Sequence, residues 1–146
     1  MPTLASYLTE PSRRDRVLED CVRMVDEEVD SKGGLTGIAI KTAYGLVKRI
    51  KPGFVRRALD GMLDDFAQNL DPIFQEHLAK GGSLVDHFVA HKDGVAEALL
   101  SITDGRAKRA TNATAKSAYG KLRPSGKKHV EDAVPRLARM IEQHAR

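Results

Sequence analysis

The chain has no tryptophan and few other aromatic residues, with three tyrosines and four phenylalanines among 146 residues. Leu, Val, Ile, Met and Ala must therefore fill most of the core, which suits packed helices better than a β-sandwich. No segment sustains the alternation of apolar and polar residues that marks a half-buried strand. The sequence therefore predicts an all-α protein, and its length predicts a single domain over residues 1–146.

Cysteine is nearly absent too, because Cys21 is the only one. A single thiol excludes an intrachain disulfide and a multi-cysteine metal site. Cys21 stands among Val17, Leu18, Met24 and Val25. We therefore interpret it as a small buried apolar residue and not as a nucleophile.

Long hydrophobic runs are missing as well. The most apolar segment, residues 35–50, carries Lys41, Lys48 and Arg49, so it falls short of the roughly 20 apolar residues that a membrane span needs. The N-terminus has no basic stretch followed by an apolar run, which argues against a signal peptide. We expect a cytoplasmic protein that makes no membrane contact.

Apolar residues at helical spacing predict a compact bundle of about five to seven helices. The segment 35–49 is apolar on nearly every side, so we expect it to be the central helix of this bundle. Asp71 and Pro72 read as a cap followed by a first helical residue, and Pro135 should kink or split the last helix. The expected helices cover residues 13–29, 35–49, 54–70, 72–79, 83–90, 93–102 and 113–122, with a last helix that begins after Ser125.

Two short runs nearly match. Residues 41–45 read Lys-Thr-Ala-Tyr-Gly and residues 116–120 read Lys-Ser-Ala-Tyr-Gly, 75 positions apart. Alignment of the two halves at this offset adds little, so we interpret the echo as a shared packing solution or chance. An internal duplication would require the two helices to be related by a pseudo-twofold axis.

Charge is unevenly distributed along the chain. Residues 1–30 hold four Lys/Arg and eight Asp/Glu, whereas residues 105–130 hold eight Lys/Arg and no acid. Such a block concerns partners more than fold. Ser125 should cap the last helix, where unpaired amides and the helix dipole favour an anion. The candidate anion- or partner-binding residues are therefore Arg106, Lys108, Arg109, Lys116, Arg123, Ser125, Lys127 and Lys128.

Two arrangements of this basic block are open. It can fold back on internal acids such as Glu27, Glu28 or Asp64, or it can face solvent and bind an acidic protein, an anionic ligand or nucleic acid. Tyr119 is its only aromatic residue, which makes a poor stacking surface for single strands. A homodimer is a further option, in which the acidic N-terminal helix of one copy meets the basic block of another.

His87 and His91 stand four residues apart, so on a helix they share one face, as two metal ligands do. Asp86, Glu76 and His77 could add ligands. The HExxH motif is absent, however, and a histidine pair on a short polar helix is usually solvated. We therefore predict no metal site, no cofactor and no catalytic residue.

Residues 35–45, 50–54 and 119–129 resemble an uncharacterised family of small bacterial proteins that is frequent in actinobacteria. The resemblance implies a compact helical domain and a bacterial cytoplasmic setting, and it supplies no functional residue. The sequence thus favours a non-enzymatic binding or scaffold module acting through residues 106–129. The alternatives are a small-molecule binder or enzyme with a pocket beside the central apolar helix, and a weak nucleic-acid binder.

Overall fold

The computed structural model describes residues 2–145, and none of these residues forms a strand. This confirms the predicted all-α class. Glycine-containing turns separate most of the long helices, as the sequence indicated. The helices are α1 (Leu4–Leu8), α2 (Pro11–Ser31), α3 (Gly34–Lys48), α4 (Phe54–Lys80), α5 (Leu84–Ala90), α6 (Lys92–Arg109), α7 (Ala113–Leu122), the 3-10 turn η1 (Arg123–Ser125) and α8 (Gly126–His144).

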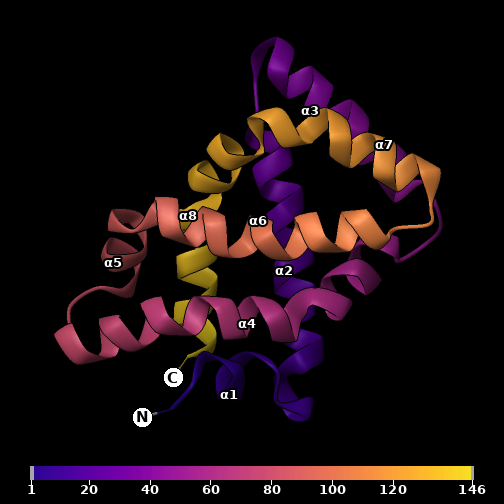
Figure 1. Ribbon diagram of the computed structural model, residues 1–146. Helices are drawn as coiled ribbons and strands as arrows, with labels where there is room; N and C mark the ends of the chain where they lie inside the picture. The colour runs from indigo at the N-terminus through magenta and orange to yellow at the C-terminus, as the bar shows by residue number, and fades with distance from the viewer. Residues whose placement is uncertain (1, 146) are drawn as a thin grey trace.

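The main hydrophobic core lies between α1, α2, α4, α5, α6 and α8. α4 and α6 lie across α2 and α8, while α1 and α5 pack at the edges (Figure 1). Cys21 is buried here as predicted, and its Sγ lies 3.6 Å from the Met140 sulfur. The most deeply buried side chains include Val17, Leu70, Phe74, Phe88, Val95, Val134 and Ile141.

The expectation that residues 35–49 form the central helix is wrong. The helix exists as α3, but it lies with α7 at one end of the molecule (Figure 1). Only one side of α3, which includes Gly37, Ile40 and Ala43, is buried. A helix that is apolar all round can be buried on every side, or it can bury one stripe and leave another exposed. Periodicity alone does not distinguish these two cases.

The prolines do not divide the helices. α4 continues through Pro72 and α8 continues through Pro135. The predicted role of Asp71 as a cap for a separate helix is therefore wrong. Its carboxylate instead accepts a hydrogen bond from the Leu4 amide at 2.8 Å, which satisfies a free donor at the start of α1.

The two halves of the chain repeat one arrangement. α1 packs on α4 as α5 packs on α8, and α2 packs on α4 as α6 packs on α8. Across the halves, α4 contacts α6 as α8 contacts α2, and α3 packs on its own counterpart α7. Each of these helix pairings in one half thus has a counterpart in the other half. This is the pattern expected when two halves are related by a pseudo-twofold axis.

The tyrosine of each echoed run makes the same interactions. Tyr44 donates to Asp26 Oδ1 at 2.6 Å, and Tyr119 donates to Asp104 Oδ1. The basic residue four positions after each tyrosine, Lys48 or Arg123, pairs with that same oxygen, at 3.5 and 2.8 Å respectively.

Further matches extend the repeat beyond the echo. Asp26 and Asp104 are 78 positions apart, and Asp-x-Val-x-Glu occurs at residues 15–19 and again 78 positions later at 93–97. Arg56 pairs with Asp15 at 3.1 Å, and Lys127 pairs with Asp93 at 2.5 Å. The echo is therefore part of a repeat that runs along the chain, and not only a local solution.

Candidate interaction face

The α3–α7 pair is held in place by a tight turn before α3. Gly34 has φ of 70°, a conformation that favours glycine. A Cβ on Gly37 would lie 2.7 Å from the backbone carbon and oxygen of Lys32, so only glycine lets the two segments come this close. α3 then runs beside α7 in the opposite direction, with Ala43 and Ala118 buried (Figure 1).

The outer side of α3 carries an exposed apolar stripe, which we call the α3 ridge: Leu35, Ile38, Ala39, Thr42 and Leu46. Positions at i, i+3, i+4, i+7 and i+11 share one face of a helix. The large side chains on it are 87% exposed for Leu35, 63% for Ile38 and 42% for Leu46. Contiguous exposed apolar surface of this kind commonly marks an interaction site.

The internal repeat shows that the fold does not require the α3 ridge. With Tyr44 aligned to Tyr119, the three large ridge residues correspond to Ala110, Ala113 and Lys121. The second half therefore keeps the same helix pairing with small or charged residues at these positions. The apolar character of the α3 ridge calls for an explanation other than folding.

The charged residues that α3 and α7 themselves contribute are all basic. Neither α3 nor α7 contains an Asp or Glu, and together they carry Lys41, Lys48, Lys116 and Lys121. Lys48 pairs with Asp26 and lies over the Tyr44 ring at 5.3 Å. The other three lysines are exposed and form no ion pair with any residue from 2 to 145.

Part of the predicted basic site is bound internally. Lys127 pairs with Asp93 at 2.5 Å and with Glu97 at 3.0 Å, both on α6. Arg123 forms two hydrogen bonds to Asp104, also on α6, at 2.8 and 3.2 Å. These pairs join α6 to η1 and to the first turn of α8, so each of the two cations already has an acidic partner within the chain.

The Asp104 cluster also fixes the only aromatic residue of the basic segment. Arg123, and then the Tyr119 hydroxyl, hold the pKa of Asp104 below its usual range by hydrogen bonding. Burial, and then the bond to Asp104, raise the pKa of Tyr119 to about 12. The Tyr119 hydroxyl is therefore committed to Asp104.

Ser125 does not provide the predicted anion site. Its side chain makes no capping hydrogen bond to α8, and its hydroxyl donates to the Leu122 carbonyl at 3.4 Å. The Gly126 amide, which was expected to be free, donates to the Arg123 carbonyl. α7, η1 and α8 form a nearly continuous helical path, so the preceding turn supplies an acceptor that an isolated helix start would lack.

The basic block does not fold back on the acids expected to receive it. Glu27 and Glu28 pair with Arg136 of α8, at 3.4 and 3.0 Å, and Asp64 pairs with Arg14 at 3.2 Å. Arg106 lies over Gly61 of α4, where an added Cβ would be 2.5 Å from its guanidinium. The predicted residues with exposed side chains are Arg106, Lys108, Arg109, Lys116 and Lys128.

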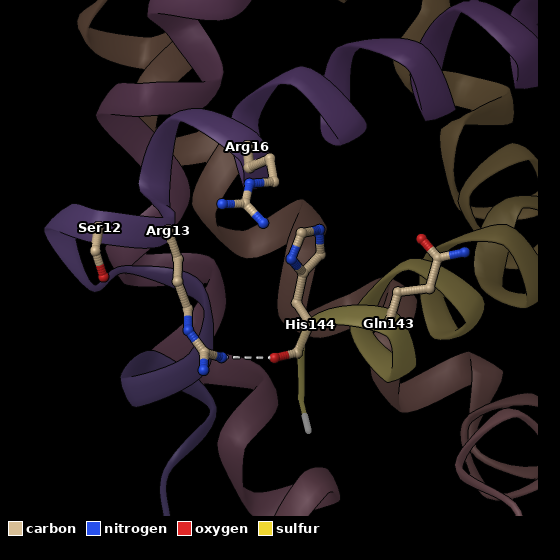
Figure 2. Close-up of a pocket in the computed structure, with 5 residues that line it drawn as sticks. All are labelled: Ser12, Arg13, Arg16, Gln143 and His144. Atoms are coloured by element: carbon tan, nitrogen blue, oxygen red, sulfur yellow. Dashed lines mark hydrogen bonds between the residues drawn. The ribbon is translucent and has the colours of Figure 1, made fainter.

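The two best-formed hollows among residues 2–145 lie between α2 and α8, and neither touches α3. The larger, of about 380 Å³, is lined by Ser12, Arg13, Arg16, Gln143 and His144, and Arg13 donates across it to the His144 carbonyl at 2.8 Å (Figure 2). His144 Nε2 lies 2.7 Å from Asp20. The alternative of a ligand pocket beside the apolar helix gains no support from these hollows.

The described residues form a helical bundle of two repeated halves, with an exposed apolar helix and a basic flank. The chain belongs to a family described as "Family of unknown function (DUF6918)", whose model matches residues 4–145. Comparison with curated proteins and with solved structures gave no match. Within residues 2–145, every helix is too short or too polar to cross a bilayer.

Proposed function

We propose that this protein is a binding module whose α3–α7 face receives an acidic amphipathic helix of a partner protein. The observation that carries the proposal is the α3 ridge, because its large side chains are exposed here and are absent from the matching helix of the second half. Three large apolar side chains at helical spacing match the way that one helix packs its stripe on another.

The charge of this face determines the partner's chemistry. Lys41, Lys116 and Lys121 are exposed without an acidic neighbour on either helix. Arg109 and Lys108 continue the positive charge at the end of α6, just before α7 begins. Complementary charge favours association with an acidic partner and disfavours a basic one. The predicted acidic protein partner therefore suits this face.

A second copy of the chain fits the face less well. If two α3 ridges met, the lysines of one α3–α7 pair would lie near the lysines of the other. Neither pair contains an acid to offset this repulsion. In the alternative contact, between an acidic α2 and a basic block, three of the acids are already engaged: Asp15 pairs with Arg56, Asp20 lies 2.7 Å from His144, and Glu28 pairs with Arg136. Only Glu19 and Asp30 of α2 are exposed without an ion pair among residues 2–145, which leaves little negative charge for a basic block. Nucleic acid is disfavoured because Tyr119 is the only aromatic residue of the basic segment, which makes a poor stacking surface. The resemblance noted above supports a bacterial cytoplasmic setting for this binding.

The test uses two synthetic amphipathic helices with the same leucine stripe, one with glutamates and one with lysines on its polar face. Binding to the purified full chain is measured by fluorescence anisotropy. We expect the glutamate peptide to bind, with an affinity that falls as salt rises. Leu35→Gln with Ile38→Gln should abolish binding, whereas Val89→Gln, at the exposed apolar residue of α5, should not.

Charge reversal gives an independent arm. Lys116→Glu with Lys121→Glu should weaken glutamate-peptide binding at least about tenfold at low salt, where exposed charges act over roughly 10 Å or more. Lys92→Glu on α6 is the matched control. Equal binding of both peptides, or binding that survives the α3 ridge variant, would refute the proposal. Two other results would also refute it, because each assigns the α3 ridge to a different occupant. One is a salt-resistant dimer that the ridge variant loses, and the other is binding to anionic vesicles that the ridge variant loses.

A further inference from the structure

Two histidines and one glutamate converge from three parts of the chain: Glu76 from the last turns of α4, His87 from α5, and His91 from the junction of α5 with α6. Glu76 Oε1 is 4.0 Å from His87 Nε2 and 3.5 Å from His91 Nε2. One ligand atom from each residue lies within 4.8 Å of the other two.

The expectation that both histidines are solvated is wrong for His87. Its side chain is 11% exposed, and its Nε2 is buried without a hydrogen-bond partner among residues 2–145. α4 covers it, because that helix continues through Pro72 far enough to bring Glu76 beside the pair. A buried polar atom without a partner costs free energy, so a ligand at this nitrogen would be stabilising.

His91 is oriented to offer a lone pair. Its Nδ1 lies 2.9 Å from the His87 backbone carbonyl, which can only accept a hydrogen bond. In the neutral imidazole Nδ1 therefore carries the proton, and Nε2, on the side of Glu76, is left as an acceptor. A backbone carbonyl that fixes the ring in this tautomer is the usual outer-shell support of a metal-binding histidine.

We infer that Glu76, His87 and His91 form a binding site for a divalent transition metal of the zinc class. Two imidazoles and a carboxylate suit this class, whereas Mg²⁺ and Ca²⁺ prefer oxygen ligands alone. Metal bonds of about 2.0–2.2 Å place tetrahedral ligand atoms roughly 3.3–3.5 Å apart. Glu76 and His91 already have that separation, and His87 needs to approach Glu76 by about half an ångström.

Three protein ligands leave a fourth position for water or a substrate. Glu76 and His91 are 41% and 40% exposed, so an ion can enter from solvent. Lys80 competes for the site, because its ammonium lies 3.0 Å from the same Glu76 oxygen. The bound ion would displace this ammonium and join α4 to the α5–α6 junction.

Two other positions show that the cluster is specific to these three residues. His77 is close, with its ring 6.0 Å from that of His87, but it is not among the three converging ligands. With Leu4 aligned to Leu84, the counterpart of His87 in the first half is Tyr7. The cluster is thus particular to the second half and is not required by the repeated arrangement.

The test titrates the tag-free, metal-stripped full chain with CoCl₂ and with ZnCl₂. We expect one Co²⁺ per chain with the intense visible absorption of a tetrahedral complex, displaced by Zn²⁺. His91→Ala and Glu76→Gln, both at partly exposed positions, should each weaken binding by more than the roughly 10–100-fold typical of losing an outer-shell partner. Lys80→Ala should tighten binding by removing the competing cation.

The control is His77→Gln, which should bind Co²⁺ as the natural chain does. His87→Ala should also lose binding, and circular dichroism shows whether that variant remains folded. If it unfolds, the two partly exposed variants decide the matter. Failure to bind Co²⁺ at micromolar concentration, or binding that His91→Ala and Glu76→Gln leave intact, would overturn the assignment. So would equal loss in His77→Gln, which would indicate nonspecific histidine binding.

Discussion

The turn into α3 makes a quantitative prediction about Gly37. In Gly37→Ala the new Cβ would meet the backbone of Lys32 at 2.7 Å, and backbone atoms cannot swing aside as a side chain can. Overpacking of this kind costs about 1–3 kcal/mol, while alanine gains up to about 1 kcal/mol in helix propensity. With a propensity gain of about 1 kcal/mol, we therefore expect a net loss of up to about 2 kcal/mol in the free energy of unfolding, measured by urea titration with far-ultraviolet circular dichroism.

Gly45 provides the matched control on the same helix. A Cβ there meets nothing within 4 Å, so Gly45→Ala should gain about 0.5–1 kcal/mol from propensity alone. Because both changes alter helix propensity equally, their difference isolates the contact with Lys32. At roughly 2–4 °C per kcal/mol for a chain of this size, the two variants should melt several degrees apart. Equal stability would refute the close approach of the α2–α3 turn.

The remaining predictions concern the paired tyrosines and Asp104. Tyr44→Phe and Tyr119→Phe should each lower the free energy of unfolding by about 0.5–1.5 kcal/mol, because each removes a hydroxyl that donates to an aspartate. Urea titrations measure both losses, and a loss in only one variant would contradict the equivalence of the two tyrosines. The pKa of Asp104 is held low mainly by Arg123, so its contribution to stability is present above its unfolded pKa of about 3.9 and is lost as pH falls through the lower folded value. Asp104→Asn should therefore flatten the acid side of the stability profile below about pH 4, and an unchanged acid side would exclude this role.

Local sequence signals predicted much of the helical framework. Glycines at 33–34, 53 and 81–82 separate helices where expected, and Ser83 caps α5 by accepting the Asp86 amide at 3.2 Å. These features depend on neighbouring residues only, so they can be inferred without tertiary contacts. The position of α3 could not be inferred, because both of its faces are apolar and only its tertiary contacts with α7, α2 and α4 select the buried one.

The sequence offers His87, His91 and Glu76 as possible ligands, but their convergence could not be predicted from it. A break at Pro72 separates Glu76 from the long helix in the sequence-based picture, whereas the structure continues α4 to Lys80 and carries Glu76 to His91. Proline removes one amide donor, and tertiary packing can offset that loss. The approach of Glu76 to a histidine 15 residues later is a tertiary fact that no local pattern encodes.

The internal repeat was hidden by its changing spacing. Matching residues are 80 positions apart in α1 and α5, 78 in α2 and α6, and 75 in α3 and α7. A comparison at one fixed offset therefore aligns one helix pair and misaligns the others. The contacts of Tyr44 and Tyr119 with equivalent aspartates reveal the relation, because helices can keep their pairing while the loops between them shorten.

The burial of Cys21 makes this chain a convenient background for site-specific labelling. The thiol is 7% exposed, and burial raises its pKa to about 12, so it stays protonated and shielded in the folded protein. A cysteine introduced on the surface is then the only reactive sulfur available to a maleimide dye or nitroxide. Probes at the exposed positions 35 on α3 and 89 on α5 could report on these two helices separately, without removal of the natural thiol.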